Sequence, residues 1–178
     1  MDDRVDVGVL GATGAVGQRL IRLLEDHPWF RLGEACGSAA STGKTLAERI
    51  GAGADGLSSE TAGLRLQAPD GPWTSSILLS ALPSAPAQEL EIQLAEAGHL
   101  VVSNASSHRM GETVPLIIPE VNGDHLDLLT NQPWKGALVT NPNCAAVGLV
   151  MALAPLHETF GIEIFVGRSK IDHFRFRF

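Results

Sequence analysis

The sequence has no tyrosine, only two cysteines, and an aromatic content of just 5%. Cys36 and Cys144 lie far apart and are too few to staple a small secreted domain with disulfides. No apolar run is long enough for a transmembrane helix. The start, MDDRVDVGVLG, has no basic segment followed by an apolar one, so no secretion signal is predicted. These absences predict a cytoplasmic location.

Basic residues are also scarce, with 13 Lys and Arg against 20 Asp and Glu and a formal net charge of −7. An acidic chain without a long basic run is a poor nucleic-acid binder, so a small molecule is the expected partner. Apolar residues are plentiful, at 44% of 178, which is enough for a packed core and argues against disorder. The charge is uneven, because residues 164–178 hold four basic residues and one acidic residue.

Apolar, strand-like runs alternate with amphipathic helical segments along the chain. Strands are predicted at residues 5–10, 30–36, 76–82, 99–103, 116–118, 137–140 and 161–166, and helices at 15–26, 86–97, 123–130 and 145–159. Residues 51–76 are predicted to be irregular with short strands, and Pro155 is expected to kink or end the last helix. This alternation predicts an α/β fold, namely a Rossmann-like, doubly wound, mostly parallel sheet.

A glycine-rich turn joins the first predicted strand to the first predicted helix. Its spacing is G-x-x-G-x-x-G, over Gly11, Ala12, Thr13, Gly14, Ala15, Val16 and Gly17. Glycines permit a tight turn and close backbone approach to a pyrophosphate, which the helix N-terminus would attract. The position after a strand and before a helix favours nucleotide binding over the alternative of a plain turn.

The end of the second strand indicates which nucleotide is bound. An NAD site has an acidic residue at that strand's tip, whereas Glu34 lies two residues inside the strand. The loop that follows offers Ser38, Ser41 and Lys44. Hydroxyls and a lysine suit a 2′-phosphate, so NADP is favoured; the alternative is that all three are ordinary loop residues. No metal site is predicted.

Cys144 follows Thr140-Asn141-Pro142-Asn143 at the start of a predicted helix. Asn141 or Asn143 can cap the helix, and Pro142 suits its first turn. A thiolate there would be stabilised by free N–H groups and the helix dipole, which would make it a nucleophile. A buried core cysteine is the alternative for Cys144, and it is the preferred interpretation of Cys36.

Four motifs, in order, resemble the aspartate-β-semialdehyde dehydrogenase family. They are GATGAVGQ at 11–18, SNASSHRM at 103–110, PLIIPEVNGDHL at 115–126 and NPNCAAVGLVMALAPL at 141–156. The set is most similar to the archaeal and fungal branch, which includes malonyl-CoA reductases. The resemblance implies an NADP-dependent oxidoreductase that reduces L-aspartyl-4-phosphate through a cysteine thioester, in lysine, threonine and methionine biosynthesis.

The resemblance also implies roles for individual residues. Cys144 corresponds to the nucleophile, Asn143 helps to shape the site, and Arg109 binds the substrate phosphate. Asn104 and Ser106 approach the nicotinamide and phosphate, residues 11–17 form the cofactor loop, and Ser38, Ser41 and Lys44 hold the 2′-phosphate. The family often has arginine where this sequence has Ala40, which predicts weaker selectivity for NADP. His108 is expected to be exposed, while Asn122 and His125 are expected to position a helix.

The resemblance covers residues 4 to about 163 and divides the chain into three parts. Residues 1–140 are expected to form an NADP-binding domain, and 141–163 the start of a catalytic domain whose remainder is absent. Residues 164–178 are interpreted as a divergent tail, although Phe174–Phe178 alternates like an edge strand.

Weak or no turnover is predicted for this chain alone. Relatives are usually homo-oligomeric, but this chain's oligomeric state is left open. A malonyl-CoA reductase and a non-catalytic nucleotide-binding fragment are the alternatives.

Overall fold

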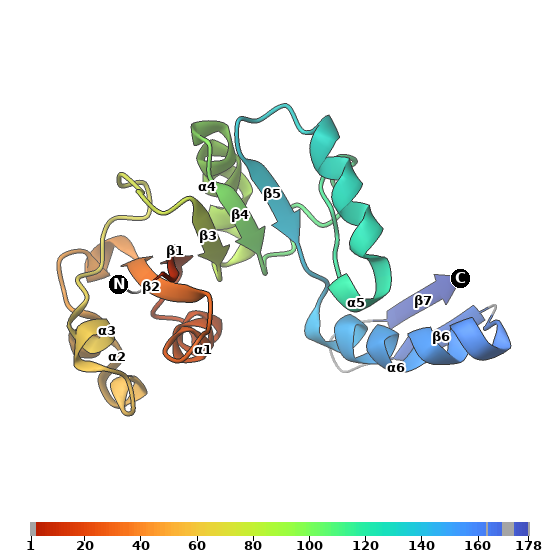
Figure 1. Cartoon of the computed structure of the whole chain (residues 1–178), viewed down its shortest axis with the longest axis horizontal. Coiled ribbons are helices and arrows are strands. Elements are labelled where there is room, and N and C mark those ends of the chain that lie inside the picture. The colour runs from red at the N-terminus through yellow and green to blue at the C-terminus, as the bar shows by residue number, and fades with distance from the viewer. Residues whose placement is uncertain (1–2, 163, 169–172, 178) are drawn as a thin grey trace.

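A computed structural model describes residues 3–162, 164–168 and 173–177, and its centre is a five-stranded parallel sheet (Figure 1). The strands are β1 (Val5–Leu10), β2 (Phe30–Cys36), β3 (Ile77–Ser80), β4 (Leu100–Ser103) and β5 (Ala137–Thr140). Their spatial order is β2-β1-β3-β4-β5. The chain therefore builds outward from β1 to one side and then to the other, which confirms the predicted doubly wound sheet.

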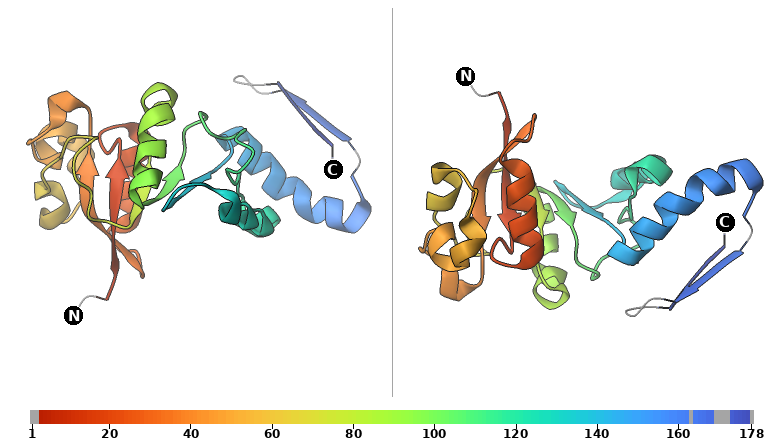
Figure 2. Two further views of the ribbon diagram at one scale, coloured as in Figure 1. Left: turned by 90° about the horizontal axis from the view of Figure 1, so that it is seen from above. Right: turned by 90° about the horizontal axis from the view of Figure 1, so that it is seen from below.

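Helices cover both faces of this sheet, so the molecule has two apolar cores (Figure 2). Helix α1 (Ala15–Leu24) packs Ile21 and Leu24 against Val7 and Val9 of β1. Helix α4 (Ser84–Ala97) packs Leu94 and Ala95 in the other core, with Leu10, Leu78, Val101 and Leu138. Because successive strand residues point to opposite faces, each apolar strand supplies both cores.

Short helices connect the longer elements. They are η1 (Ala39–Ser41), α2 (Leu46–Ile50), η2 (Gly51–Ala54) and α3 (Ser59–Gly63), followed along the chain by α5 (Pro119–Asn122) and η3 (Gly123–Asn131). Helical structure at η3 agrees with the helix predicted at 123–130, whereas η2 and α3 lie where short strands were expected. The prediction of short strands within 51–76 is therefore wrong for its first half. The predicted strand at 116–118 is reduced to one isolated bridge, between Leu116 and Thr140. A helix of one turn has too few residues to show a 3.6-residue period.

Helix α6 (Cys144–Phe160) leaves the end of β5 and points away from the sheet (Figures 1 and 2). It continues through Pro155 to Phe160, so of the kink and the early stop expected at this proline, the early stop does not occur. None of its residues is buried, as expected for its apolar face, and the Phe160 side chain is 78% exposed. Strands β6 (Ile164–Arg168) and β7 (His173–Arg177) pair antiparallel as a separate sheet. No helix in the described ranges has the length and apolar character needed to cross a bilayer.

Candidate active site

The five strands of the sheet end at one level, and this places all the predicted functional loops along a single edge. Paired Cα positions join the last residues of neighbouring strands, in the row Cys36–Leu10–Ser80–Ser103–Thr140. Each loop is then fastened to its neighbour by backbone hydrogen bonds, from Ala12, Ala81, Asn104 and Asn141 to Cys36, Leu10, Ser80 and Ser103 respectively. In doubly wound folds, ligands bind outside this carboxyl edge.

The glycine turn closes so tightly that it leaves no room for a side chain at Gly11 or Gly17. Gly11 has φ +76°, and a Cβ there would lie 2.7 Å from the Ala81 carbonyl oxygen. A Cβ on Gly17 would collide with the carbonyl oxygen of Gly11. Gly14 caps α1 with no side chain, while Ala15 and Val16 are exposed in the first turn. The N–H groups of Ala12 and Gly14 donate to the Cys36 and Gly11 carbonyls, whereas the N–H groups in the first turn of α1 have no partner within the helix and can serve an anion.

A cavity of about 400 Å³ lies between this turn and the loops after β2 and β3. Its wall includes Gly11, Thr13, Gly14, Gly37, Ser38, Ala81, Leu82 and Pro83. It opens between β1 and β3, where the chain reverses the direction in which it adds strands. This switch point is where dinucleotides bind in such sheets.

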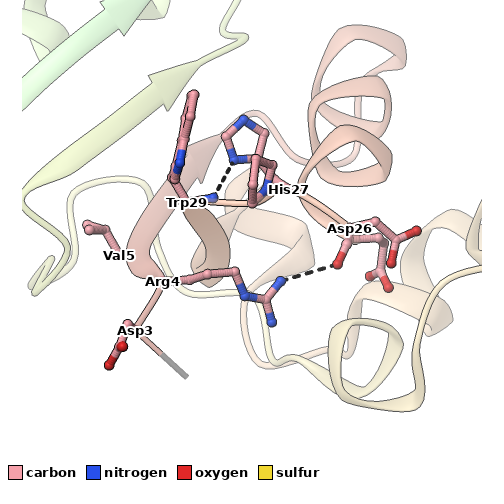
Figure 3. A pocket seen from close by; sticks show the side chains of 8 residues that line it. Asp3, Arg4, Val5, Asp26, His27 and Trp29 are labelled. Carbon is pink, nitrogen blue, oxygen red and sulfur yellow. Dashed lines mark hydrogen bonds between the residues drawn. The ribbon is translucent and has the colours of Figure 1, made fainter. Parts of the chain in front are cut away.

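A second hollow, of about 750 Å³, lies at the opposite edge of the sheet, where β1 and β2 begin (Figure 3). Trp29, His27 and Arg4 border it together with Asp3, Glu25 and Asp26. Three acidic residues would repel a dinucleotide phosphate, and no glycine turn lies there. We therefore assign nucleotide binding to the smaller cavity.

The geometry around Glu34 bears on the choice between NAD and NADP. Its Oε2 accepts hydrogen bonds from the Ser75 backbone N–H at 2.7 Å and from the Ser75 hydroxyl at 2.6 Å. Burial raises the pKa of Glu34, but the hydrogen bonds from Ser75 and Thr74 outweigh it and hold the pKa below the ordinary value. This carboxylate therefore holds the segment before β3 in place and is not free to bind ribose hydroxyls. The cavity end near β2 instead carries Ser38, and Ser41 is buried beside it.

Cys144 is the first residue of α6 and is exposed, so the structure places it as predicted. The Asn143 side chain caps the helix by accepting a hydrogen bond from the Ala146 N–H at 2.8 Å. This cap satisfies one of the four N–H groups that have no partner within a helix, and it leaves those of Cys144 and Ala145 at the exposed end. The capping asparagine thereby fixes the direction in which Cys144 leaves the sheet.

Arg109 connects the loop after β4 with the loop that carries Cys144. Its Nε donates to the Asn141 carbonyl at 2.9 Å, and its Nη2 donates to the Asn104 carbonyl at 2.8 Å. The Asn141 side-chain amide also donates to Asn104 Oδ1 at 2.9 Å. A half-buried guanidinium with further N–H groups thus lies at the base of both loops. Ser106 is tied to Ser84 through their hydroxyls, 2.8 Å apart.

Comparison with known proteins decides the family. A family model described as "Semialdehyde dehydrogenase, NAD binding domain" matches residues 6–129, which is more than half of the chain. The chain belongs to the semialdehyde dehydrogenase family. An aspartate-semialdehyde dehydrogenase of Archaeoglobus fulgidus is 45% identical over 161 residues, with 87% of this chain and 47% of the relative covered. A malonyl-CoA reductase (NADP) of Metallosphaera sedula is 36% identical over 159 residues, with 85% and 44% covered.

A crystal structure of the Candida albicans aspartate-semialdehyde dehydrogenase with NADP has a TM-score of 0.82 and 31% sequence identity to this chain. The structural match covers 93% of this chain and 51% of the Candida albicans chain. The chain spans about half the length of the curated relatives it matches. The part shared with this family includes the sheet, the glycine turn and the Cys144 loop.

Sequence reasoning missed a buried carboxylate that lies behind these loops. Glu91 of α4 is fully buried, and its Oε1 accepts hydrogen bonds from Ser80 Oγ at 2.5 Å and Ser103 Oγ at 2.7 Å. His108, expected to be exposed, has only a tenth of its side chain accessible, with Nε2 3.7 Å from Glu91 Oε2. Asn122 and His125, expected to position a helix, instead hydrogen-bond the backbone of Leu116 and Ile118, and the Asn122 side chain does not cap η3. One signal in the sequence could have indicated such a group: Ser80 and Ser103 end two apolar strands, and buried hydroxyls there need a hydrogen-bond acceptor.

The two cysteines are expected to differ sharply in alkylation rate. Cys36 is fully buried, and burial raises the pKa of its thiol to about 11. Since the thiolate is the reactive form, Cys36 should stay protonated and inert at pH 8, and its reaction should be at least about 100-fold slower than that of Cys144. Titration of the native chain with a thiol reagent should label one cysteine. Cys144→Ser should abolish this labelling and Cys36→Ser should preserve it; fast labelling of Cys144→Ser would contradict the assignment.

Proposed function

We propose that the chain is the nucleotide-binding and nucleophile-bearing part of an NADP-dependent aspartate-semialdehyde dehydrogenase. The supporting observation is the exposed Cys144, in the first turn of α6, at the same sheet edge as the dinucleotide-sized cavity. Residues 1–140 would form the cofactor domain and 141–163 the beginning of the catalytic domain, while 164–178 stand apart. The activity belongs in the cytoplasm, where a nucleophilic thiol stays reduced, and would supply lysine, threonine and methionine synthesis.

Cys144 and its surroundings supply the covalent chemistry. The thiolate would attack the acyl carbon of L-aspartyl-4-phosphate, and phosphate would leave to give a thioester on Sγ. The N–H groups of Cys144 and Ala145 lie where they can stabilise the oxyanion on that carbon, and Asn143 holds the helix end that carries them. Arg109 would bind the substrate phosphate through the N–H groups that its two carbonyl contacts leave over. Collapse of the oxyanion after reduction would release aspartate semialdehyde and the thiolate.

The residues around the cavity fit NADP. When bound, the cofactor supplies the hydride that reduces the thioester. Gly11, Thr13, Gly14, Ala15, Val16 and Gly17 would hold the pyrophosphate, Ser38, Ser41 and Lys44 the 2′-phosphate, and Asn104 and Ser106 the nicotinamide end. The fit rests on the absence of a Cβ at Gly11, Gly14 and Gly17, and on a Glu34 carboxylate already bonded to Thr74 and Ser75.

Ligand binding by the chain tests this proposal without requiring turnover. NADPH titration, followed by fluorescence, should show saturable binding. Aspartate semialdehyde should then slow alkylation of Cys144 in the presence of NADP, because both compete for access to Sγ. The absence of saturable NADPH binding would contradict the proposal.

The malonyl-CoA reductase of Metallosphaera sedula suggests a second candidate reaction. Such an enzyme takes its acyl group from a thioester. If this were the reaction of the present chain, incubation with malonyl-CoA would leave a malonyl adduct on Cys144, which intact mass would detect and which Cys144→Ser would lack. Because we propose the aspartyl phosphate reaction, we expect no adduct. An adduct that requires Cys144, together with no protection by aspartate semialdehyde, would favour malonyl-CoA as the substrate.

A further inference from the structure

Arg49, in the last turn of α2, reaches back to the loop after β2. Its Nε donates a hydrogen bond to Ser41 Oγ at 2.8 Å. The Ser41 side chain is fully buried, and its Oγ lies 3.3 Å from Ser38 Oγ. Ser38 lines the cavity. A chain of polar atoms therefore links the Arg49 guanidinium to the end of the cavity that faces β2.

Gly37 keeps this end of the cavity open. A Cβ on Gly37 would lie 2.9 Å from Thr13 Cγ2 and 3.0 Å from Ser41 Oγ. Thr13 and Gly37 both line the cavity. The loop thus approaches the glycine turn closely, and two serine hydroxyls mark the place. In this fold class the tip of the second strand is where the 2′ substituent of the adenosine ribose is read.

Three cations lie near this loop, and Glu48 compensates the charge of two of them, Arg65 and Lys44. Hydrogen bonds from Thr45, and then the positive charges of Arg65 and Lys44, hold the pKa of Glu48 below its ordinary value, so an ionised carboxylate lies near Lys44. Arg65 is engaged with the Gly43 carbonyl at 2.8 Å. Within the described ranges, Arg49 makes a single side-chain hydrogen bond and no ion pair.

The base of α2 is held firmly, so Arg49 is presented in a fixed direction. Thr45 and Glu48 form a capping box at the helix start, and Leu46 is fully buried in the core on the α1 face. The backbone before the helix is bonded to residues 64–66, through Gly43 N–H to Leu66 and Leu46 N–H to Leu64. The anchored backbone, together with the Nε bond to the buried Ser41, reduces the conformational entropy that the exposed Arg49 side chain would lose on binding.

We infer that Arg49 is a specificity-determining residue that binds the 2′-phosphate of NADP. Its Nε stays on Ser41, and the planar guanidinium leaves its Nη groups for phosphate oxygens. Ser38, which lines the cavity, would supply a hydroxyl to the same group, and the buried Ser41 holds the guanidinium beside it, whereas Ala40 in the same loop has no polar side chain. This inference rests on the proposed function, because it requires NADP to occupy the cavity.

Binding of NADPH and NADH to Arg49→Gln tests the inference. Loss of a guanidinium–phosphate contact should weaken NADPH binding about 10- to 100-fold and change NADH binding less than about twofold. Arg49→Lys should lie between Arg49→Gln and the unmodified chain, because it keeps the charge but not the fork. Lys135→Gln, an exposed lysine in the loop before β5, removes the same charge far from the cavity and should bind both nucleotides like the unmodified chain. Circular dichroism and thermal melting confirm that each variant is folded.

The outcomes separate the two proposals. Unchanged NADPH binding by Arg49→Gln, or an equal loss for NADPH and NADH, would overturn the role of Arg49 while the cofactor assignment stands; equal loss would mean that Arg49 acts only through the position of Ser41. No NADPH binding by the unmodified chain would overturn the proposed function and this inference together. Competition by 2′,5′-ADP but not by 5′-ADP, lost in Arg49→Gln, would support the inference independently.

Discussion

Replacing Glu91 with leucine is expected to lower the free energy of unfolding by about 3 kcal/mol, although leucine is apolar and similar in size. The substitution leaves the hydroxyls of Ser80 and Ser103 without their acceptor, and both side chains are fully buried. Each unsatisfied buried donor costs about 1–3 kcal/mol. Urea unfolding followed by circular dichroism measures the difference.

Two controls separate hydrogen bonding from the shape of the side chain at position 91. Glu91→Gln keeps an oxygen acceptor in the same place and should lose less than half as much stability. The triple variant Glu91→Leu, Ser80→Ala, Ser103→Ala removes the two hydroxyl donors and their acceptor together and should recover about half of the loss, because the buried Ala105 N–H then lacks its acceptor, Ser103 Oγ. A loss below about 1 kcal/mol for Glu91→Leu alone would contradict this account of the cluster.

Gly17→Ala is expected to damage both the fold and nucleotide binding. Its methyl group would meet the Gly11 carbonyl oxygen and come within 2.8 Å of Ala12 Cα, and these backbone atoms cannot rotate away. Overpacking of this kind should cost about 2–3 kcal/mol of stability. It should also push the start of α1 off the end of β1, weakening NADPH binding by about 100-fold or more, since the pyrophosphate would lose its N–H groups.

Gly14→Ala is the matched control for that result. A Cβ on Gly14 would lie 3.4 Å from the Gly11 carbonyl oxygen, which is an ordinary contact, and Gly14 has φ −80°. The variant should therefore melt close to the unmodified chain but bind NADPH about 10-fold more weakly, because its methyl group faces the ligand. Equal NADPH affinity for Gly14→Ala and the unmodified chain would show that the pyrophosphate does not approach this turn.

The fold was predictable wherever a long apolar run ended at a glycine or polar residue. The strands at 5–10, 30–36 and 137–140 have the predicted bounds, because each is rich in apolar residues, although β1 includes Asp6 and the edge strand β2 includes Arg31 and Glu34. The single-turn helices between 39 and 63 were not predictable, because they are too short to show a helical period; α2 and α3 depend instead on side-chain caps, and the start of α2 on backbone bonds to residues 64–66. The helix predicted at 145–159 is present, and of the two effects expected of Pro155 the early stop does not occur, because proline removes one intrahelical hydrogen bond and the helix continues past it.

The site was predictable where local sequence sets local geometry. The glycine turn and the Asn143–Cys144 helix start are both of this kind, and the structure forms both. Glu91 and Arg49 act across distance: one reaches two strand ends from the middle of a helix, the other a serine eight positions earlier. An acidic residue inside an amphipathic helix resembles a solvent-facing one, so its burial could not be deduced before the helix was placed on the sheet.

The strand order has a consequence for how the chain folds as it is synthesised. Strand β1 lies between β2 and β3, so one of its edges stays unpaired until residues 77–80 emerge. At about 5–20 residues per second, the ribosome needs several seconds to synthesise the residues between β2 and β3, and this edge of β1 is unpaired during that time. An unpaired edge can pair with another nascent chain. The short helices between residues 37 and 75 therefore emerge from the ribosome before β3 pairs with β1, so they can pack while one edge of β1 is still unpaired.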